Sequence, residues 1–291
     1  MPDPAVDFSW WDWPFHPEVV VGLLLLEVVY LLGVGPWRRR WDLAPSVKRS
    51  QVVVFSSGVL LLYLTLVSPL HELADHYLFS AHMVQHLVLM LVVPPLLIWG
   101  TPPWLLRPLV RPRWVLTASR FLTHPVVAFG LFTTVLAVWH LPVLFNLAMG
   151  NELVHHSQHL TFLVASVIMW WPVMSPLQEV PRAGYLVQMV YLFALTLPSN
   201  FVGAAIAMSD RVLYSSYDTP ARLWGISALD DQGNGGLIMQ VPCGLFFLGV
   251  LTGVFFVWFN RAERGAADSS EAGAREPSPG QEAASRPSAG S

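Results

Sequence analysis

Charged residues are scarce in this sequence of 291 residues: Asp, Glu, Lys and Arg together make up 12% of it, against roughly 25% in a typical soluble domain. Lysine is almost absent, since 15 of the 16 basic residues are arginine. The net charge of −3 provides no basic surface for nucleic acid. A single cysteine, Cys243, excludes an internal disulfide framework. These absences exclude the ordinary soluble and disulfide-rich classes.

The sequence is rich in hydrophobic residues, which make up 54% of it, and it contains long apolar stretches. A helix needs about 20 apolar residues to cross a hydrocarbon core. No segment shows the short alternating pattern of a barrel strand. We therefore expect an all-α fold, a polytopic membrane bundle of seven transmembrane helices. The seven predicted spans are 16–35, 51–69, 77–100, 124–145, 154–175, 183–209 and 236–259.

The ends of the chain differ from this middle part. Residues 1–15 contain acidic but no basic residues, so we expect a short extracytoplasmic segment and not a cleavable signal peptide. Residues 261–291 are rich in Ala, Gly, Ser, Pro and Glu, and we expect a disordered cytoplasmic tail. The membrane domain is then 16–260. Within it, Pro198 in the middle of the sixth span predicts a kink or a locally opened helix.

Basic residues in the connecting segments predict the orientation. The first, third and fifth connections and the start of the tail hold nearly all of them, whereas the opposite set of connections holds only Arg211 and Arg222. By the positive-inside rule, the amino terminus is outside and the carboxyl terminus is cytoplasmic. The basic residues on the predicted cytoplasmic side are Arg38, Arg39, Arg40, Lys48, Arg49, Arg107, Arg111, Arg113, Arg120, Arg182, Arg261 and Arg264.

Histidines gather on the outer side of this topology, with His124 as the only exception among the ten. Two pairs have helical spacing: His82 with His86, and His155 with His159, each four residues apart and therefore on one helix face. A lone histidine at a membrane boundary is usually an interfacial residue. Two paired sets on the same side instead predict a metal or cofactor site, because polar groups within spans usually face a bundle interior.

Imidazole is a common ligand for copper, zinc and iron, and sulfur ligands select Cu(I). We therefore expect copper, as Cu(I), with zinc or haem as alternatives. Met and Cys also serve as ordinary core residues, so the sulfur positions are the weaker candidates. The predicted metal ligands are His82, His86, His155, His159, His140, His156, Met83 and Cys243.

An acidic segment precedes the last span on the same side as the histidines. Asp231 and Gln232 lie in the sequence ALDDQGNGGLIMQ, and Asp75 lies between the second and third spans. An aspartate here serves as a helix cap, which needs no further function. Alternatively, these three residues orient the imidazoles from behind the ligand shell.

At these residues the sequence resembles the seven-helix CtaG-type cytochrome c oxidase assembly factors of bacteria. The resemblance rests on FSAHMVQHLVLMLVVPPLLIWGTP at 79–102, HHSQHLTFLVASVIMWWPVMSP at 155–176, LPSNFVGAAIAMSDRVLYSSY at 197–217 and DDQGNGGLIM at 230–239. His82, His86, His155 and His159 match the family pattern, as do Asp231 and Gln232. The family pattern usually continues DQQ, whereas here Gln232 is followed by Gly233.

The resemblance implies a membrane assembly factor, and not an enzyme, in the bacterial cytoplasmic membrane. It implies copper supply to a haem–copper cytochrome c oxidase at the extracytoplasmic face. The expected partners are the oxidase subunits and the lipid bilayer, with an extracytoplasmic copper chaperone as a further candidate and no nucleic acid.

Two other classes stay open on the residues alone. A membrane-embedded zinc hydrolase would use three histidines as ligands and a carboxylate as the base, for which His71 and Asp75 add to the set. A haem-binding protein would use histidines as axial ligands, with His140 facing His86 or His159.

Overall fold

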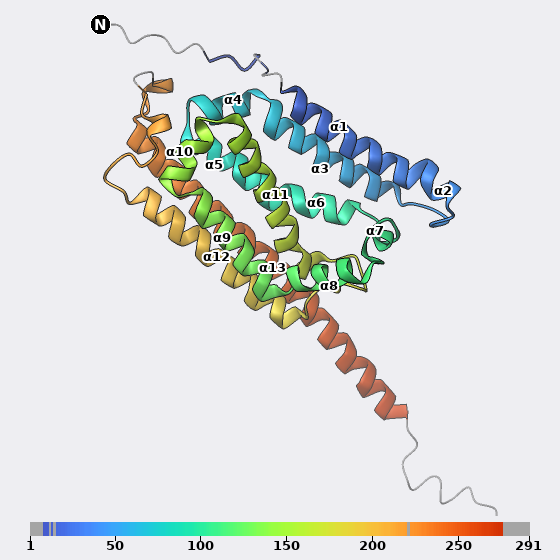
Figure 1. Cartoon of the computed structure of the whole chain (residues 1–291). Coiled ribbons are helices and arrows are strands. Elements are labelled where there is room, and N and C mark those ends of the chain that lie inside the picture. The colour runs from blue at the N-terminus through green and yellow to red at the C-terminus, as the bar shows by residue number, and fades with distance from the viewer. Residues whose placement is uncertain (1–7, 12, 14–15, 220–221, 276–291) are drawn as a thin grey trace, which may run out of the picture.

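Helices account for all the regular structure in residues 8–11, 13, 16–219 and 222–275, the part of the chain that this computed structural model describes (Figure 1). The predicted all-α fold is therefore confirmed. The π-helical turns η1 (Gly33–Trp37) and η2 (Val88–Val92) join α1 to α2 and α5 to α6. The α-helices are α1 (Pro17–Leu32), α2 (Arg38–Arg40), α3 (Arg49–Val67), α4 (Pro69–His76), α5 (Phe79–Leu87), α6 (Val93–Gly100), α7 (Pro103–Val110), α8 (Arg113–Leu122), α9 (Pro125–Trp139), α10 (Pro142–Met149), α11 (Glu152–Met174), α12 (Tyr185–Ala207) and α13 (Ala228–Arg275).

Five helical stretches in the described residues are long and apolar enough to cross a membrane. They are Pro17–Arg40, Arg49–Val67, Phe79–Gly100, Tyr185–Ala207 and Ala228–Arg264. A sixth is obtained if α8 and α9, which meet at an angle of 70°, form one bent span. The helix α11 has 23 residues but is not in this set. Its first turns carry histidine and glutamine in place of apolar residues.

The stretch 124–145, predicted as one span, is interrupted in the structure. The helix α9 ends at Trp139 and α10 begins at Pro142. A proline has no amide hydrogen and pushes the preceding residue away from helical angles. Leu141 accordingly takes φ −64° and ψ 128°. The break leaves His140 at the carboxyl end of α9.

The stretch α5–η2–α6 is the most buried of the five, and it lies between α3, α11 and α13. Apolar residues from all these helices meet in one continuous core around Met83, Leu89, Phe162 and Phe247. By contrast, the stretch Pro17–Arg40 is only 17% buried, and its helix α1 packs mainly against α3. Side chains on α5 therefore point into the molecule, and those on α1 mostly face outward.

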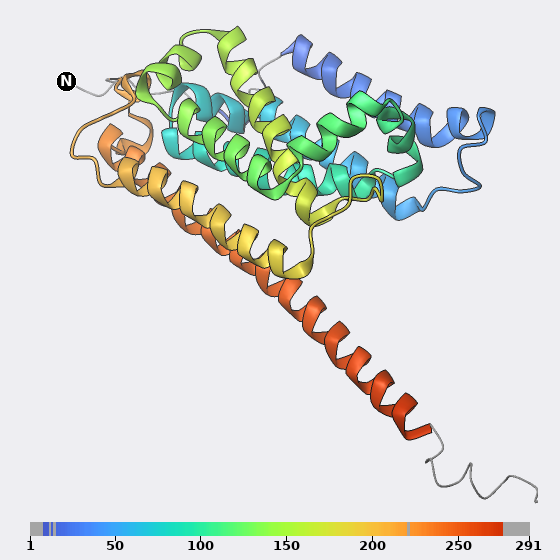
Figure 2. The same cartoon turned by 60° about the horizontal axis from the view of Figure 1, so that its bottom comes forward.

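The helices α12 and α13 run side by side in both views (Figures 1 and 2). Glycines allow this close approach: a Cβ atom at Gly236 would lie 2.6 Å from the carbonyl oxygen of Gly203. Small residues serve this purpose in membrane helix pairs. Of the two alternatives predicted at Pro198, the locally opened helix does not occur, since α12 is continuous from Tyr185 to Ala207. The kink stays a prediction.

The last helix is longer than predicted at both ends. It begins at Ala228, so the acidic segment before the predicted span is already helical, and it continues to Arg275. We predicted instead that the chain is disordered from residue 261 onward. Alanine, arginine and glutamate in 261–275 favour helix, and extending an existing helix needs no new nucleus. Most of the predicted amino-terminal segment, and 276–291 of the predicted tail, lie outside the described residues.

Candidate metal centre

The histidine-bearing helix α5 is held at its start by a carboxylate from α13. The residue before it, Leu78, has no side chain that accepts a hydrogen bond. Instead, Asp231 accepts hydrogen bonds from the amides of Phe79 (2.6 Å) and Ser80 (3.1 Å) and from the hydroxyl of Ser80. These groups would otherwise lack partners at a helix start. The bonds fix the position of α5 relative to α13.

The second histidine-bearing helix, α11, has an ordinary cap of its own. The side chain of Asn151 accepts a hydrogen bond of 3.1 Å from the amide of Val154. His155 and His159 then follow on one face, separated by about one turn, and both are buried. That face lies against α5, so the two predicted histidine pairs meet inside the bundle.

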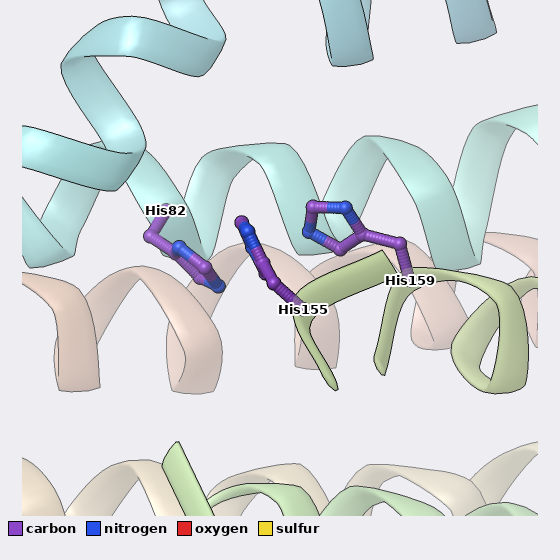
Figure 3. Close-up of side chains that lie close together, drawn as sticks. All are labelled: His82, His155 and His159. Atoms are coloured by element: carbon purple, nitrogen blue, oxygen red, sulfur yellow. The ribbon is translucent and has the colours of Figure 1, made fainter. Parts of the chain in front are cut away.

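Three imidazoles form the centre of the site: His82 from α5 with His155 and His159 from α11 (Figure 3). One ring nitrogen from each lies within 4.8 Å of the others, and all three residues are buried. In the view of Figure 3, the ring of His155 lies between the other two. Such separations suit ligands around one ion, because metal–nitrogen bonds of about 2.0–2.1 Å place ligand atoms a few ångströms apart.

Two further imidazoles adjoin these three. The ring of His86 lies 5.6 Å from that of His159 and 6.0 Å from that of His140, between ring centres. A hydrogen bond of 2.7 Å joins Nδ1 of His140 to the carbonyl oxygen of Leu136. That bond requires the proton on Nδ1 and leaves Nε2 of His140 with a lone pair. His86 and His140 thus extend the cluster toward α9.

Asp75 supports the cluster from the short helix α4. One carboxylate oxygen lies 3.2 Å from Nδ1 of His155 and 3.4 Å from Nε2 of His71. Burial would raise the pKa of Asp75, but the hydrogen bond from His155 and the neighbouring imidazoles lower it overall, so the group is ionised at neutral pH. Because His155 donates through Nδ1, its Nε2 atom keeps a lone pair. A carboxylate behind a metal-binding imidazole fixes the ring in this way.

His71 is held by bonds at both ring nitrogens. The amide group of Gln85 donates to Nδ1 of His71 at 2.9 Å and to the carbonyl oxygen of Thr65 at 2.7 Å. The other nitrogen, Nε2, faces Asp75. Burial lowers the pKa of His71 to about 4, partly opposed by Asp75, so the ring is neutral at pH 7. His71 therefore positions Asp75 and offers no lone pair to an ion.

Tyr217 fixes the protonation of His82. The hydroxyl of Tyr217 donates to the carbonyl oxygen of Ala74 at 2.5 Å, and burial raises the pKa of this phenol well above its ordinary value. Its oxygen therefore accepts from Nδ1 of His82, which is 3.2 Å away. The proton on Nδ1 leaves a lone pair on Nε2, which lies 2.9 Å from Nε2 of His86. In the absence of an ion, Nε2 of His86 donates its proton to this lone pair. An ion bound to Nε2 of His82 would replace that hydrogen bond.

Several ring nitrogens in the cluster have no hydrogen-bond partner among the described residues. They are Nδ1 of His86, Nε2 of His140, Nε2 of His155 and Nε2 of His159, and all of them are buried. A buried polar atom without a partner costs about 1–3 kcal/mol. With the proton on the other ring nitrogen, each of these atoms offers a lone pair to a metal ion, so this donor set fits an imidazole-bound ion.

Residues 28–261 match the family model described as the cytochrome c oxidase caa3 assembly factor. The match covers most of the chain and contains the whole histidine cluster of α5, α9 and α11. The chain belongs to this family. The resemblance predicted from the sequence is thereby confirmed. The family is one of assembly factors and not of enzymes.

Relatives of this assembly-factor chain occur in mycobacteria. It is 26% identical over 271 residues to uncharacterised proteins of Mycobacterium bovis and Mycobacterium tuberculosis, which covers 88% of this chain. It is 25% identical over 268 residues to an uncharacterised protein of Mycobacterium leprae. The chain spans 40% of the length of these relatives. No solved structure is significantly similar to it.

Three predicted ligands of this family member lie away from the central imidazoles. Met83 is fully buried in the apolar core and packs beside Gly235 of α13. Cys243 lies next to Ser199 of α12 and belongs to no group of potential ligands in the described chain. It is about 18 Å along α13 from Asp231, which explains why it does not reach the cluster. His156 belongs to a different group, with His16 and Glu18.

The two residues predicted to orient imidazoles from α13 act through the backbone instead. Asp231 binds the start of α5, as described above. Gln232 accepts from the amide of Leu213 at 2.6 Å and donates to the carbonyl oxygen of Arg211 at 3.1 Å. These bonds hold the loop that leads to Tyr217. Both residues thus place the elements that carry the site.

Sequence reasoning did not single out the two glutamines of the site. Gln85 and Gln158 are both fully buried, and neither polar atom of Gln158 has a partner among the described residues. A signal was present, because each precedes the second histidine of its pair, in HMVQH and HHSQH. Tyr217 gave no local signal, since the chain brings it to His82 from a distant loop.

Proposed function

We propose that this chain assists the assembly of a haem–copper cytochrome c oxidase by holding copper at the extracytoplasmic face of the bacterial cytoplasmic membrane and passing it to the oxidase. Membership of the assembly-factor family supports the role in oxidase assembly. The observation that carries the choice of a metal is the set of buried imidazole nitrogens without partners, on His86, His140, His155 and His159.

The charge of the cluster favours a monovalent ion. Its imidazoles are neutral ligands, and Asp75 is the one carboxylate within 4 Å of His82 and His155 in the described residues. Cu(I) with one carboxylate has no net charge, whereas a divalent ion would leave a positive charge buried. Uncompensated buried charge costs several kcal/mol. Among the described residues the central group of potential ligands consists of three imidazoles, and copper accepts this ligand type.

In the proposed topology α11 is a further span, which together with the bent pair α8–α9 gives seven. The amino terminus is outside, and the histidine end of the bundle faces outward. At the opposite end, arginines of the third connection contact the fifth connection: Arg107 lies 3.2 Å from the carboxylate of Glu179, and Arg120 donates to the carbonyl oxygen of Glu179. That arrangement agrees with a cytoplasmic location of the basic connections.

A zinc hydrolase and a haem protein are less well supported. A hydrolase needs its carboxylate beside an open ligand position, but Asp75 lies behind the imidazoles, at the nitrogens that carry protons. A haem needs a flat space between two imidazoles. Here the rings of His82 and His86 pack against Phe145 and Phe162, with ring centres 5.1 and 4.7 Å apart. A macrocycle would have to displace both phenyl rings.

The test of this function is oxidase activity in a deletion strain grown with limiting copper. We expect oxidase polypeptides that contain too little copper, with activity restored by the wild-type gene and partly by added copper. A gene encoding His82→Gln, His155→Gln and His159→Gln should fail to restore activity, although its product is present in the membrane. Normal oxidase copper in the deletion strain would contradict the proposal.

A further inference from the structure

A second group of potential ligands lies outside the buried cluster. His16 directly precedes α1, Glu18 is in the first turn of α1, and His156 is in the first turns of α11. One carboxylate oxygen of Glu18 lies 3.7 Å from Nδ1 of His16 and 3.7 Å from Nε2 of His156. The three ligand atoms all lie within 4.8 Å of one another.

These separations resemble those of a metal site more than those of hydrogen bonds. Hydrogen bonds to nitrogen have lengths of about 2.7–3.2 Å. Ligand atoms bound tetrahedrally at about 2.1 Å are about 3.4 Å apart. Small side-chain movements at the surface would bring Glu18 and both imidazoles to that separation. Two imidazoles and a carboxylate, with water in the remaining position, are a ligand set found in zinc enzymes.

Exposure distinguishes this outer group from the buried cluster. The side chains of His16, His156 and Glu18 are 26%, 30% and 52% exposed, so a hydrated ion reaches them directly. The carboxylate is a hard donor, which favours divalent ions, and its exposure to water lowers the cost of the remaining charge. The outer group therefore suits Zn²⁺ or Cu²⁺, whereas the buried cluster suits Cu(I).

A cavity connects the two groups. It has a volume of about 180 Å³ between α1, α3 and α11, and His156 of the outer group and His159 of the buried cluster both line it. His71 lines it as well, with its ring centre 5.0 Å from that of His16 and 6.0 Å from that of His159. The rest of the lining is aliphatic. The outer group thus lies beside a cavity that also reaches the buried cluster.

We propose that His16, Glu18 and His156 form an outer metal site that binds one divalent ion, Zn²⁺ or Cu²⁺, beside this cavity. An ion held there joins α1 to α11. Because α1 is otherwise packed mainly against α3, the ion would also fasten α1 across the cavity. The outer site does not depend on which ion the buried cluster holds.

Metal titration of the full-length protein tests this site. Zn²⁺ is added to wild-type protein and to the single variants His16→Gln, Glu18→Gln and His156→Gln, with bound metal and the unfolding temperature measured. Each variant should weaken binding of one Zn²⁺ by more than the 10- to 100-fold typical of a supporting residue. Zn²⁺ should raise the unfolding temperature of the wild type, and this increase should be absent in the variants.

Two controls separate this site from other groups in the protein. The neighbouring pair His76 and Glu72, whose ligand atoms are 3.5 Å apart, offers one imidazole and one carboxylate but no third ligand among the described residues. The variants His76→Gln and Glu72→Gln should retain the ion. The variant with His82→Gln and His159→Gln should also retain it, even where Cu(I) binding is lost. Unchanged Zn²⁺ affinity in all three outer variants would overturn the proposal.

Discussion

At the scale of single residues, the protonation of each imidazole follows from the hydrogen bonds around it. The carboxylate of Asp75 accepts a hydrogen bond from Nδ1–H of His155, and the hydroxyl oxygen of Tyr217 accepts one from Nδ1–H of His82. In both rings the Nε2 atom is left with its lone pair. Both lone pairs are thus set by groups that lie outside the three central imidazoles.

Replacing Asp75 by Asn should weaken copper binding by about 10- to 100-fold, as for other residues that support a ligand. The variant loses the charge that balances Cu(I), and it no longer requires the His155 proton on Nδ1. Copper affinity measured under reducing conditions checks this prediction, with Glu72→Gln on the same helix α4 as a control. Equal affinities in the two variants would mean that Asp75 has only a structural role.

Much of the site could be predicted from the sequence, because helical spacing alone places His82 beside His86 and His155 beside His159. That these pairs would meet followed from their common side of the membrane. The role of Asp75 was less predictable, since it depends on how the short helix α4 packs against α11. Met83 and Cys243 have the right chemistry for copper, but helix rotation and depth place their sulfur atoms elsewhere.

At the scale of helices, α13 is the element that organises the site, although it contributes no imidazole. Its Asp231 fixes the start of α5, and its Gln232 holds the loop before Tyr217. The sequence holds three glycines in this segment, Gly233, Gly235 and Gly236, and in the structure Gly236 approaches Gly203 of α12 closely. The sequence did not indicate that this segment is helical, because glycine has a low helix propensity.

Replacing Gly236 by Ala should destabilise the protein by about 1–3 kcal/mol, as overpacking does in other cores. The added Cβ atom would lie 2.6 Å from a carbonyl oxygen of α12 and would push α13, with Asp231, away from α5. Thermal unfolding and copper affinity should both decrease. The matched control is Gly249→Ala on the same helix, where a Cβ atom meets nothing within 4 Å.

The control variant should be neutral or slightly stabilising, because alanine is favoured over glycine in helices by about 0.5–1 kcal/mol. If both variants behave alike, the close contact of α12 and α13 does not position the site.

At the scale of the whole molecule, most histidines and most basic residues lie toward opposite ends of the bundle, with His124, Arg211 and Arg222 as exceptions. This separation predicts that the histidine end of the bundle is on the extracytoplasmic side and the basic end on the cytoplasmic side. The single cysteine makes a direct test simple, since Cys243→Ala gives a cysteine-free protein. In that background, Asp210→Cys and Arg264→Cys each place one thiol at an exposed position, before and after the last span.

A thiol reagent that does not cross membranes should label the Asp210→Cys variant in intact cells and leave the Arg264→Cys variant unlabelled until the membrane is opened. The basic residues of the connections are the reason for this expectation. The reverse pattern would place the histidine cluster in the cytoplasm and remove the basis for copper delivery outside.

The most direct test of the central claim is the amount of Cu(I) bound by the purified full-length protein under reducing conditions. We expect about one tightly bound ion per chain in the wild type, as for a single imidazole site. The triple variant His82→Gln, His155→Gln and His159→Gln should bind none tightly, and the control variant His76→Gln should bind as the wild type does. Equal Cu(I) content in the triple variant and the wild type would contradict the account.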